Sequence, residues 1–421
     1  MVNYILSKSP NGLFLIFERS VQFDFTIRHA NFMKKSKIIF LIELVLNIIA
    51  AVFLVINNSF KNLLDVGVVF LLLLLLIWNF LRRKIEISLK LSWLNLMILP
   101  AIFTYCLNTV ANVLLVKYPV KSVLIAIIYS LLFLVYLLPV VITNAGLVKN
   151  KYARVFIAMY YIVLLLFSEN LHMNDYLSSF VNWSHSEILN GLALIPIIFC
   201  LFKSWDIRAK LNLKFRRYSN IQLIVLLVAV FFAAWYSFFH SYIYIAPTFS
   251  QLFWNWDFSE IIPTERAVLW SLGAILFEEG FRYLLIIVLL EVFKVQRGQI
   301  ELTIFLSALF FGLIHYAGLL DQGPIFIIST QAIFAFGYGC FLATLYLYSG
   351  KFWLVLLSHF SLDLIAFSLS AGGGGILSWY GNNDLLSNGL SMVFALVMTL
   401  IMFLGKQRKI MQENAARLIN A

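Results

Sequence analysis

Long apolar runs alternate with short polar segments along the whole chain. A helix that crosses a bilayer needs about 20 predominantly apolar residues, and twelve segments meet or approach this length. Their approximate limits are 38–57, 66–81, 91–116, 122–146, 153–168, 188–202, 220–242, 267–293, 302–319, 324–348, 350–370 and 388–405. The pattern therefore predicts an all-α, polytopic integral membrane protein with about twelve transmembrane helices.

The composition supports this interpretation, because 62% of the 421 residues are hydrophobic and only 12% are charged. Soluble globular domains have a very different balance. The net charge of +11 comes from Lys and Arg in short clusters between the apolar runs, as expected for loops beside an anionic leaflet. We therefore expect the lipid bilayer as a partner and no nucleic acid. Cys106, Cys200 and Cys340 all lie inside apolar runs, and we expect them to be core residues.

The charge of the loops predicts the topology. Loops 169–187 and 243–265 contain acidic residues and no Lys or Arg. Every second loop is basic, with Lys34, Lys35 and Lys37 before the first span, then Arg82, Arg83 and Lys84, then Lys149, Lys151 and Arg154, then Lys203 to Arg217, then Lys294 and Arg297, then Lys351, and Lys406, Arg408 and Lys409 in the tail. Because cytoplasmic loops are enriched in Lys and Arg, we expect a multi-pass protein of the cell membrane with both termini in the cytoplasm.

The most basic loop, "KSWDIRAKLNLKFRRY", divides the chain near residue 218. We expect an N-terminal accessory membrane region of about six helices at 1–217, a second region at 218–405 and a basic cytoplasmic tail at 406–421. Two blocks of six helices would also suit a transporter built from repeats. However, the first block has mainly Glu43 as an ionisable residue within its spans, whereas several ionisable residues lie within spans of the second block.

The apolar stretch "ILFEEGFRYLLIIVLL", residues 275–290, contains Glu278, Glu279 and Arg282. Each would cost roughly 2.5–3.5 kcal/mol at the centre of a membrane helix. On a helix, both glutamates are within reach of Arg282, at i,i+4 and i,i+3. One arginine neutralises one carboxylate, and the remaining carboxylate has the properties of a general base. The alternative is a structural polar cluster that holds helices together.

Two later motifs favour a catalytic role for these charged residues over a purely structural one. "FFGLIHYAG" contains Phe311 and His315, and "LLSHFSLDL" contains His359 and Asp363. Residues four apart share a helix face. Together with Glu278, the two histidines could hold a divalent metal such as zinc, or they could hold a water molecule beside a glutamate base. The chain contains no HExxH, GxSxG or paired CxxC motif, so the usual zincin and nucleophile-elbow signatures are absent.

With these three motifs the chain resembles the CPBP intramembrane proteases, also called the Abi or CAAX-protease family (CAAX protease and bacteriocin-processing), over roughly residues 220–405. The family pattern has two adjacent glutamates, three residues and an arginine on one helix, FxxxH on the next, and a histidine followed four residues later by Asn or Asp on a third. The stretch "FAFGYGCFLATLYLYSGKFWLVLLSHFSLDLIAF" also resembles the family's small-residue helix, tight turn and histidine helix.

The resemblance implies an intramembrane endopeptidase of the glutamate or metallo type. Its implied substrates are peptides or membrane-associated proteins, in peptide maturation or bacteriocin immunity. The implied site residues are Glu278, Glu279, Arg282, His315, His359 and Asp363. In the implied mechanism the two histidines and the aspartate position a water molecule and stabilise the oxyanion. The resemblance leaves open the oligomeric state and whether a substrate is prenylated.

The chain departs from the family pattern at one point, because "EEGFR" has two residues between the glutamates and the arginine. Counted back from Arg282, Glu278 takes the arginine-pairing place and Phe277 replaces the base, which would suit a catalytically degenerate scaffold that binds a partner membrane protein. Counted from the glutamates, Glu278 is the base and Glu279 pairs with Arg282. We favour the second alignment, because an i,i+3 pair is within contact distance and phenylalanine cannot act as a base.

Overall fold

The computed structural model describes residues 37–57, 63–81, 85–168, 187–214, 218–243, 245–246, 248–319, 323–369 and 383–419. Several residues used above to predict the topology lie outside these ranges: Lys34, Lys35, Arg82, Arg83, Lys84, most of loop 169–187, and Arg216 and Arg217. All six predicted site residues are described.

Every apolar segment of the N-terminal region contains helix. The helices are Lys37–Asn57, α2 (Leu63–Leu81), α3 (Ile85–Lys117), α4 (Ser122–Phe133), α5 (Leu138–Asn144), α6 (Lys151–Leu166) and α8 (Ile188–Ser204). The expected single span at 122–146 is built from α4 and α5, and Pro139 lies in the first turn of α5. Proline lacks an amide hydrogen, and its ring clashes with the preceding helical turn. This explains why α4 does not continue into α5.

The second region begins with a well-defined helix start. Ser219 and Gln222 form a capping box, in which each side chain accepts a hydrogen bond from the other's main-chain N–H. The helices that follow are α9 (Asn220–Tyr242), α10 (Phe249–Phe253), α11 (Glu265–Ala274), α12 (Gly280–Val292), α13 (Gln299–Ile314), α14 (Ile325–Ser349), α15 (Phe352–Ser368), α16 (Asn383–Phe403) and α17 (Gln407–Ile419). A π-helical turn, η5 (Ile275–Glu279), joins α11 to α12, and a short 3-10 helix, η6 (His315–Leu319), follows α13.

The membrane character follows from helix length and composition. In the described ranges, seven helices are long and apolar enough to cross a membrane: Lys37–Asn57, Ser92–Lys117, Pro119–Leu147, Asn220–Tyr242, Gln299–Leu319, Ile325–Ser349 and Leu385–Phe403. Shorter apolar helices lie at Val66–Asn79, Ile188–Ser204 and Phe352–Ser368. Large apolar side chains such as Phe231 and Leu400 are exposed, which suits contact with lipid. The predicted all-α membrane fold is confirmed, whereas the count of twelve spans stays a prediction.

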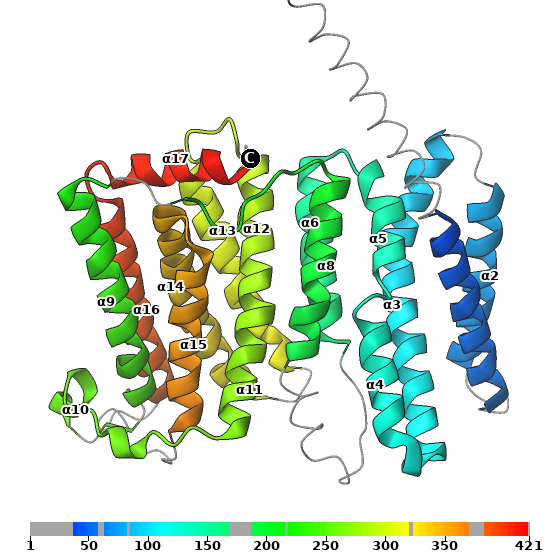
Figure 1. Ribbon diagram of the computed structural model, residues 1–421, viewed down its shortest axis with the longest axis horizontal. Helices are drawn as coiled ribbons and strands as arrows, with labels where there is room; N and C mark the ends of the chain where they lie inside the picture. Colours follow the sequence, from blue (N-terminus) through cyan, green and yellow to red (C-terminus); the bar gives the residue numbers. More distant parts are fainter. Residues whose placement is uncertain are drawn as a thin grey trace, which may run out of the picture.

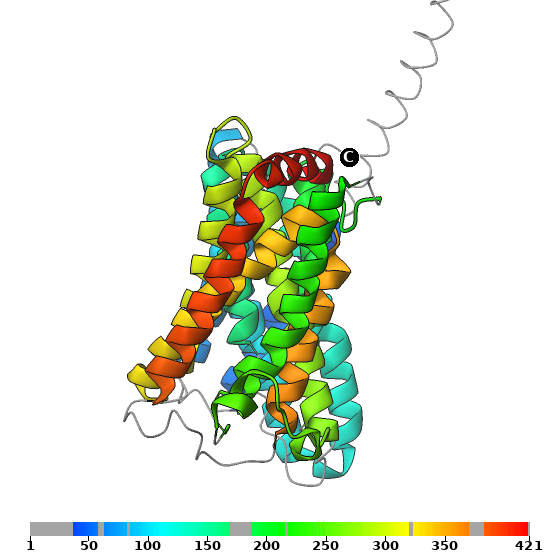
Figure 2. The ribbon, with the colours of Figure 1, turned by 90° about the vertical axis from the view of Figure 1, so that its left-hand side faces the viewer.

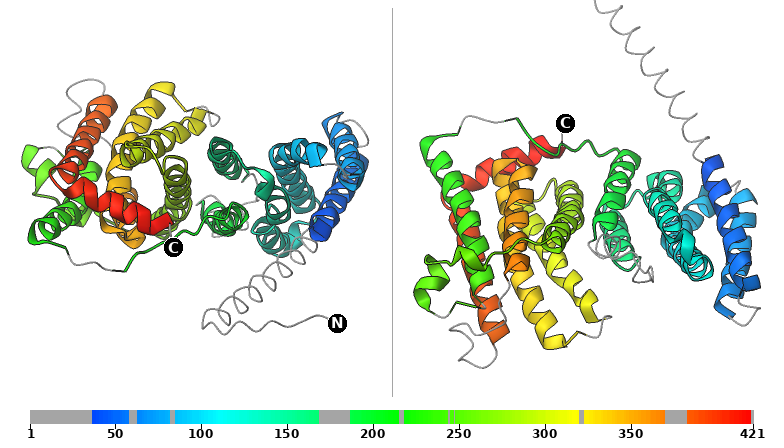
Figure 3. Two further views of the ribbon diagram at one scale, coloured as in Figure 1. Left: turned by 90° about the horizontal axis from the view of Figure 1, so that it is seen from above. Right: turned by 60° about the horizontal axis from the view of Figure 1, so that its bottom comes forward.

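The helices stand side by side with α6 and α8 at the centre (Figure 1). Seen along the helices, the N-terminal helices (blue and cyan) form one group and α9 to α16 form the other (Figure 3). Both α6 and α8 contact α12. The N-terminal region therefore packs directly against the helix that follows the two glutamates.

The described basic loops meet at one end of the molecule. At this end α17 lies across the ends of the neighbouring helices (Figure 2). The short helix α10 lies at the opposite end of the molecule. The Lys210 N–H donates to the carbonyl oxygen of Leu418, and the Arg408 guanidinium donates to that of Arg297 at 2.6 Å. Three basic segments that are far apart in sequence thus share one end, as the predicted topology requires. That this end faces the cytoplasm stays a prediction.

A cysteine-labelling experiment tests this topology. Asp257 and Arg208 are exposed, in the segments that follow α10 and α8, and these two segments lie at opposite ends of the molecule (Figure 1). In a background with the three native cysteines replaced by alanine, we expect Asp257→Cys to react with a membrane-impermeant maleimide on intact cells. Arg208→Cys should react only after permeabilisation. The reverse pattern would show that the basic end faces outward.

Candidate functional site

A π-helical turn carries the two glutamates. Ile275–Glu279 has π geometry between the α-helical segments α11 and α12, and such turns occur frequently at functional sites. Gly191 of α8 lies against this turn, because a Cβ atom there would be 2.6 Å from Leu276 Cβ and 2.8 Å from the Phe277 nitrogen. No residue larger than glycine fits this gap without a shift of the main chain. A close helix contact from the N-terminal region therefore holds the turn in place.

Glu279 and Arg282 form a bidentate ion pair. Arg282 Nε is 2.8 Å from Glu279 Oε2, and Arg282 Nη2 is 3.0 Å from Glu279 Oε1. Both side chains are fully buried, where charged residues persist only when they are paired. The guanidinium also lies 4.1 Å from the centre of the Phe311 ring, a favourable cation–π arrangement. Phe277 is buried in the core. In the structure Glu279 is the partner of Arg282, as the second alignment expects, while the role of Glu278 as the base stays a prediction.

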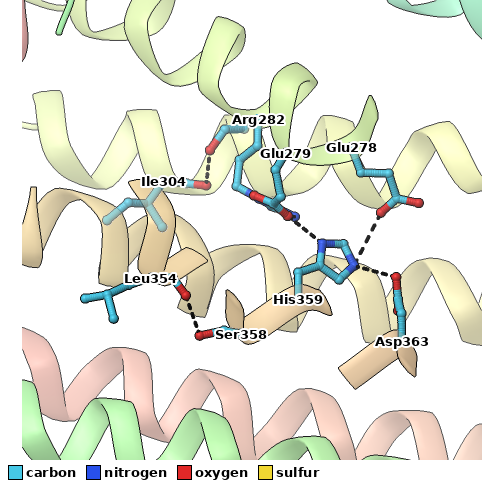
Figure 4. Close-up of polar contacts among 9 residues, drawn as sticks. Glu278, Glu279, Arg282, Ile304, Leu354, Ser358, His359 and Asp363 are labelled. Carbon is cyan, nitrogen blue, oxygen red and sulfur yellow. Dashed lines mark hydrogen bonds and ion pairs between the residues drawn. The ribbon is translucent and has the colours of Figure 1, made fainter. Parts of the chain in front are cut away.

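His359 connects this ion pair to two further carboxylates (Figure 4). Its Nδ1 is 2.6 Å from Glu279 Oε1, and its Nε2 is 3.6 Å from both Glu278 Oε2 and Asp363 Oδ2. The side chain of Glu278 is 23% exposed and that of Asp363 is 13% exposed, whereas Glu279 is fully buried. The carboxylates of Glu278 and Asp363, which lie farther from His359 than that of Glu279, are therefore the ones that solvent or a substrate can reach. A separation of 3.6 Å is too long for a direct hydrogen bond, and a water molecule beside the two atoms can hydrogen-bond to both.

His315 lies nearby but does not join this hydrogen-bonded group. It is the first residue of η6, and its Nδ1 is 2.9 Å from the carbonyl oxygen of Phe311. His315 is within electrostatic range of His359 and Asp363. Within the described ranges, however, no hydrogen bond or ion pair links it to the carboxylates. The structure therefore brings five of the predicted residues into one contacting group and places the sixth beside it.

The side chains do not form the metal-binding set that the sequence left open as one alternative. Zinc binds nitrogen and oxygen ligands at about 2.0–2.2 Å. Among the residues that the structure describes, no three His, Cys, Asp or Glu side chains are arranged to hold a metal ion. Both ring nitrogens of His359 already face carboxylates. The arrangement does not fit a site built from Glu278, His315 and His359, and no catalytic step is assigned to a metal below.

Glu187 is a fourth acidic residue close to this group. It is the N-cap of α8, with φ 60° and ψ 2°, a left-handed conformation that is uncommon for residues other than glycine. Its carbonyl oxygen accepts a hydrogen bond from the N–H of Gly191 at 2.9 Å, one helical turn closer to η5. Burial, and then the charges of Glu278 and Asp363, raise the pKa of Glu187 to about 8. No local sequence pattern marks Glu187 as a neighbour of the site, because it ends an acidic loop far from the three motifs.

Tyr338 of α14 is a second residue that the motifs did not identify. Its ring meets the His359 ring edge-on, with ring centres 5.7 Å apart. Its hydroxyl is buried and has no hydrogen-bond partner in the described part of the protein. A buried polar group without a partner needs an explanation, and a bound substrate would supply one. Tyr338 lies in the small-residue stretch that resembles the family. This resemblance is the feature of the sequence that could have pointed to Tyr338.

The comparison with protein families gives one match. Residues 262–365 match the family described as Rce1-like, type II CAAX prenyl endopeptidase Rce1-like. No curated protein and no solved structure matches the chain. The matched segment begins just before α11 and ends within α15, and it includes all six predicted site residues. The match confirms the resemblance to the CAAX protease family, and residues 262–365 are the part of this membrane protein that carries it.

Proposed function

We propose that the protein is an intramembrane endopeptidase in which Glu278 activates a water molecule. The observation that carries this proposal is the division of roles between the glutamates. Glu279 is bound to Arg282 and His359, whereas the side chain of Glu278 makes no hydrogen bond within the described residues and is partly exposed. A general base needs a carboxylate that can reach a reacting proton. Glu278 meets this condition and Glu279 does not.

In the proposed reaction, a water molecule lies beside Glu278 and His359 and is hydrogen-bonded to both. Glu278 removes one proton from this water, and the oxygen attacks the carbonyl carbon of the peptide bond. The carbonyl oxygen becomes an oxyanion, for which the Tyr338 hydroxyl is the nearby donor. Preorganised donors of this kind typically supply about 2.7–4 kcal/mol each. Collapse of the intermediate breaks the C–N bond, and the proton held by Glu278 passes to the leaving amine.

The surroundings of the site define the class of substrate. The reacting groups lie on apolar helices, so a substrate reaches them from the bilayer or its surface. We therefore propose peptides or proteins that have an apolar segment or a lipid chain and remain attached to the membrane during cleavage. The scaffold alternative relied on the alignment that pairs Glu278 with Arg282, and the observed ion pair removes that argument.

A peptidase assay with two matched peptides tests the proposed function. The purified protein, in phosphatidylcholine nanodiscs, is incubated with one peptide sequence in prenylated and unprenylated forms, and the products are identified by mass spectrometry. We expect cleavage at one bond, and the ratio of the two rates shows whether a prenyl chain is required. Activity lost with a chelator and restored by zinc would overturn the metal-free mechanism. Folded protein that binds either peptide without cleaving it would overturn the protease proposal.

The pKa of Glu187 predicts that kcat/KM of the wild type and of Glu187→Gln will differ at alkaline pH. Below about pH 8 its carboxyl is neutral, and above this pH it adds a negative charge near Glu278 and Asp363. We expect kcat/KM of the wild type to rise above about pH 8, because repulsion between the two carboxylates makes Glu278 a stronger base. Glu187→Gln stays neutral and should lose this alkaline rise.

The measurement is kcat/KM between pH 6 and pH 10 for both proteins. Glu260→Gln, at an exposed residue near α10, is the matched control and should keep the wild-type profile. Identical profiles for the wild type and Glu187→Gln would exclude this role for Glu187.

A further inference from the structure

The N-terminal region contains a cavity that is separate from the candidate protease site. The helix Lys37–Asn57, α3, α4 and α5 enclose a volume of about 580 Å³, within the range of small-molecule binding sites. These helices lie on the far side of α6 and α8 from α15 (Figure 1). Most of the lining is apolar, including Ile42, Leu46, Phe103, Leu132 and Val135. The proposed peptidase reaction makes no use of this cavity.

Among the residues that line the cavity, Glu43 is the one with a carboxyl group. Its Oε2 atom is buried and has no hydrogen-bond partner among the residues that the structure describes. The neighbouring polar side chains have other partners. The Tyr136 hydroxyl is 2.8 Å from the Thr104 hydroxyl, and the Asn47 amide donates to the main-chain oxygen of Glu43. A carboxyl oxygen without a partner in a membrane is costly and marks a functional site by default.

The cavity is reached from the lipid phase. Ile42, Leu46, Leu132 and Val135 line it and are also exposed, so the cavity opens to the surface of this apolar region, which meets lipid. An apolar lining alone would not select a ligand here, because lipid tails are as apolar as these side chains. Selection must therefore come from Glu43, which needs a hydrogen-bond donor.

We propose that this cavity binds one membrane amphiphile, with its apolar chain along α3 and α4 and an amino or hydroxyl group donating to Glu43. The position of Glu43 suits the polar end of such a molecule. Glu43 is six residues after Lys37, so it lies roughly 9 Å along the helix from that end. An amino group is the stronger complement, since it would also offset the cost of an ionised carboxylate in an apolar setting. The site would thus distinguish one lipid from another by the polar group attached to the apolar chain.

Photolabelling with three chain-matched probes tests the proposal. The probes are a long-chain amine, the corresponding alcohol and the corresponding hydrocarbon, each with the same photoreactive group and alkyne tag. The full-length protein is labelled in phosphatidylcholine nanodiscs, and the modified peptides are identified by mass spectrometry. We expect the amine and the alcohol to label residues 37–57 and 132–142, with the hydrocarbon labelling them roughly tenfold less, the effect of losing one hydrogen bond to a buried carboxyl.

Three variants complete the test. Glu43→Leu should reduce labelling by the amine and the alcohol to the hydrocarbon level, while Glu43→Gln should keep labelling by the alcohol. Glu260→Leu, far from the cavity, is the matched control and should label as the wild type does. Equal labelling by all three probes in the wild type, or unchanged labelling of Glu43→Leu, would show a crevice filled by bulk lipid and would overturn the proposal. Peptidase activity is measured separately, so failure of either proposal leaves the other unaffected.

Discussion

Replacing Glu278 by glutamine is expected to lower kcat by at least about 100-fold while leaving the fold intact. Glutamine has nearly the same shape but cannot accept a proton from water, and general-base catalysis typically contributes about 10²–10⁴-fold. Folding should survive, because Glu278 is partly exposed and its described contact is the one with His359 at 3.6 Å. The assay is cleavage of the peptide in nanodiscs, alongside thermal unfolding of the same preparations.

Two comparisons make this result interpretable. Glu260→Gln removes a carboxylate outside the site and should keep wild-type activity. Glu279→Gln changes the adjacent residue, and its main effect should be on stability. If Glu279→Gln folds normally but is inactive while Glu278→Gln unfolds, the two glutamates have exchanged roles. If neither substitution changes activity, the proposed mechanism is wrong.

Replacing Glu279 by alanine is expected to destabilise the protein by about 3–5 kcal/mol. The substitution leaves the buried guanidinium of Arg282 without its bidentate partner, and removal of one member of a buried ion pair typically has this cost. Arg282→Ala leaves the buried Glu279 without its bidentate partner and should have a similar effect. We expect a lower yield of monodisperse protein and a lower unfolding temperature for both variants.

The double variant Glu279→Leu/Arg282→Met distinguishes the effect of an unpaired buried charge from the effect of lost side-chain packing. Replacing a buried pair with apolar residues of similar volume is often neutral or stabilising, so this variant should be more stable than either single alanine variant. It should nevertheless be less active than the wild type, because Glu279 also binds His359 Nδ1. Wild-type stability of both single variants would show that the ion pair does not hold the site together.

Much of the fold could be predicted from the sequence, because a bilayer imposes a simple length rule on apolar segments. Each expected segment contains helix, and the motif residues lie on the expected helices. The pairing of Glu279 with Arg282 also follows from local spacing. These features depend on residues close in sequence, where helical geometry fixes the contacts.

Features that depend on packing between distant helices could not be predicted. The π geometry of η5 has no separate signal in "ILFEEGFRY", and the close approach of Gly191 to Leu276 is a tertiary contact. Glu187 approaches Glu278 and Asp363 through the same contact between α8 and η5. The expected role of the first six helices as an accessory region stays a prediction. The sequence contained no indication that one of these six helices, α8, contacts the turn that carries both glutamates.

The contact between Gly191 and η5 also bears on how portable the protease segment is. Residues 262–365 contain every motif, yet the backbone that abuts the π turn belongs to α8, outside this segment. In a graft onto another scaffold, flexible lipid tails would replace this partner. The turn could then relax towards regular α-helix, which would rotate Glu278 relative to His359. The six motif residues are therefore not a self-sufficient cassette, and a transplanted site would have to include α8 or an equivalent glycine-bearing helix.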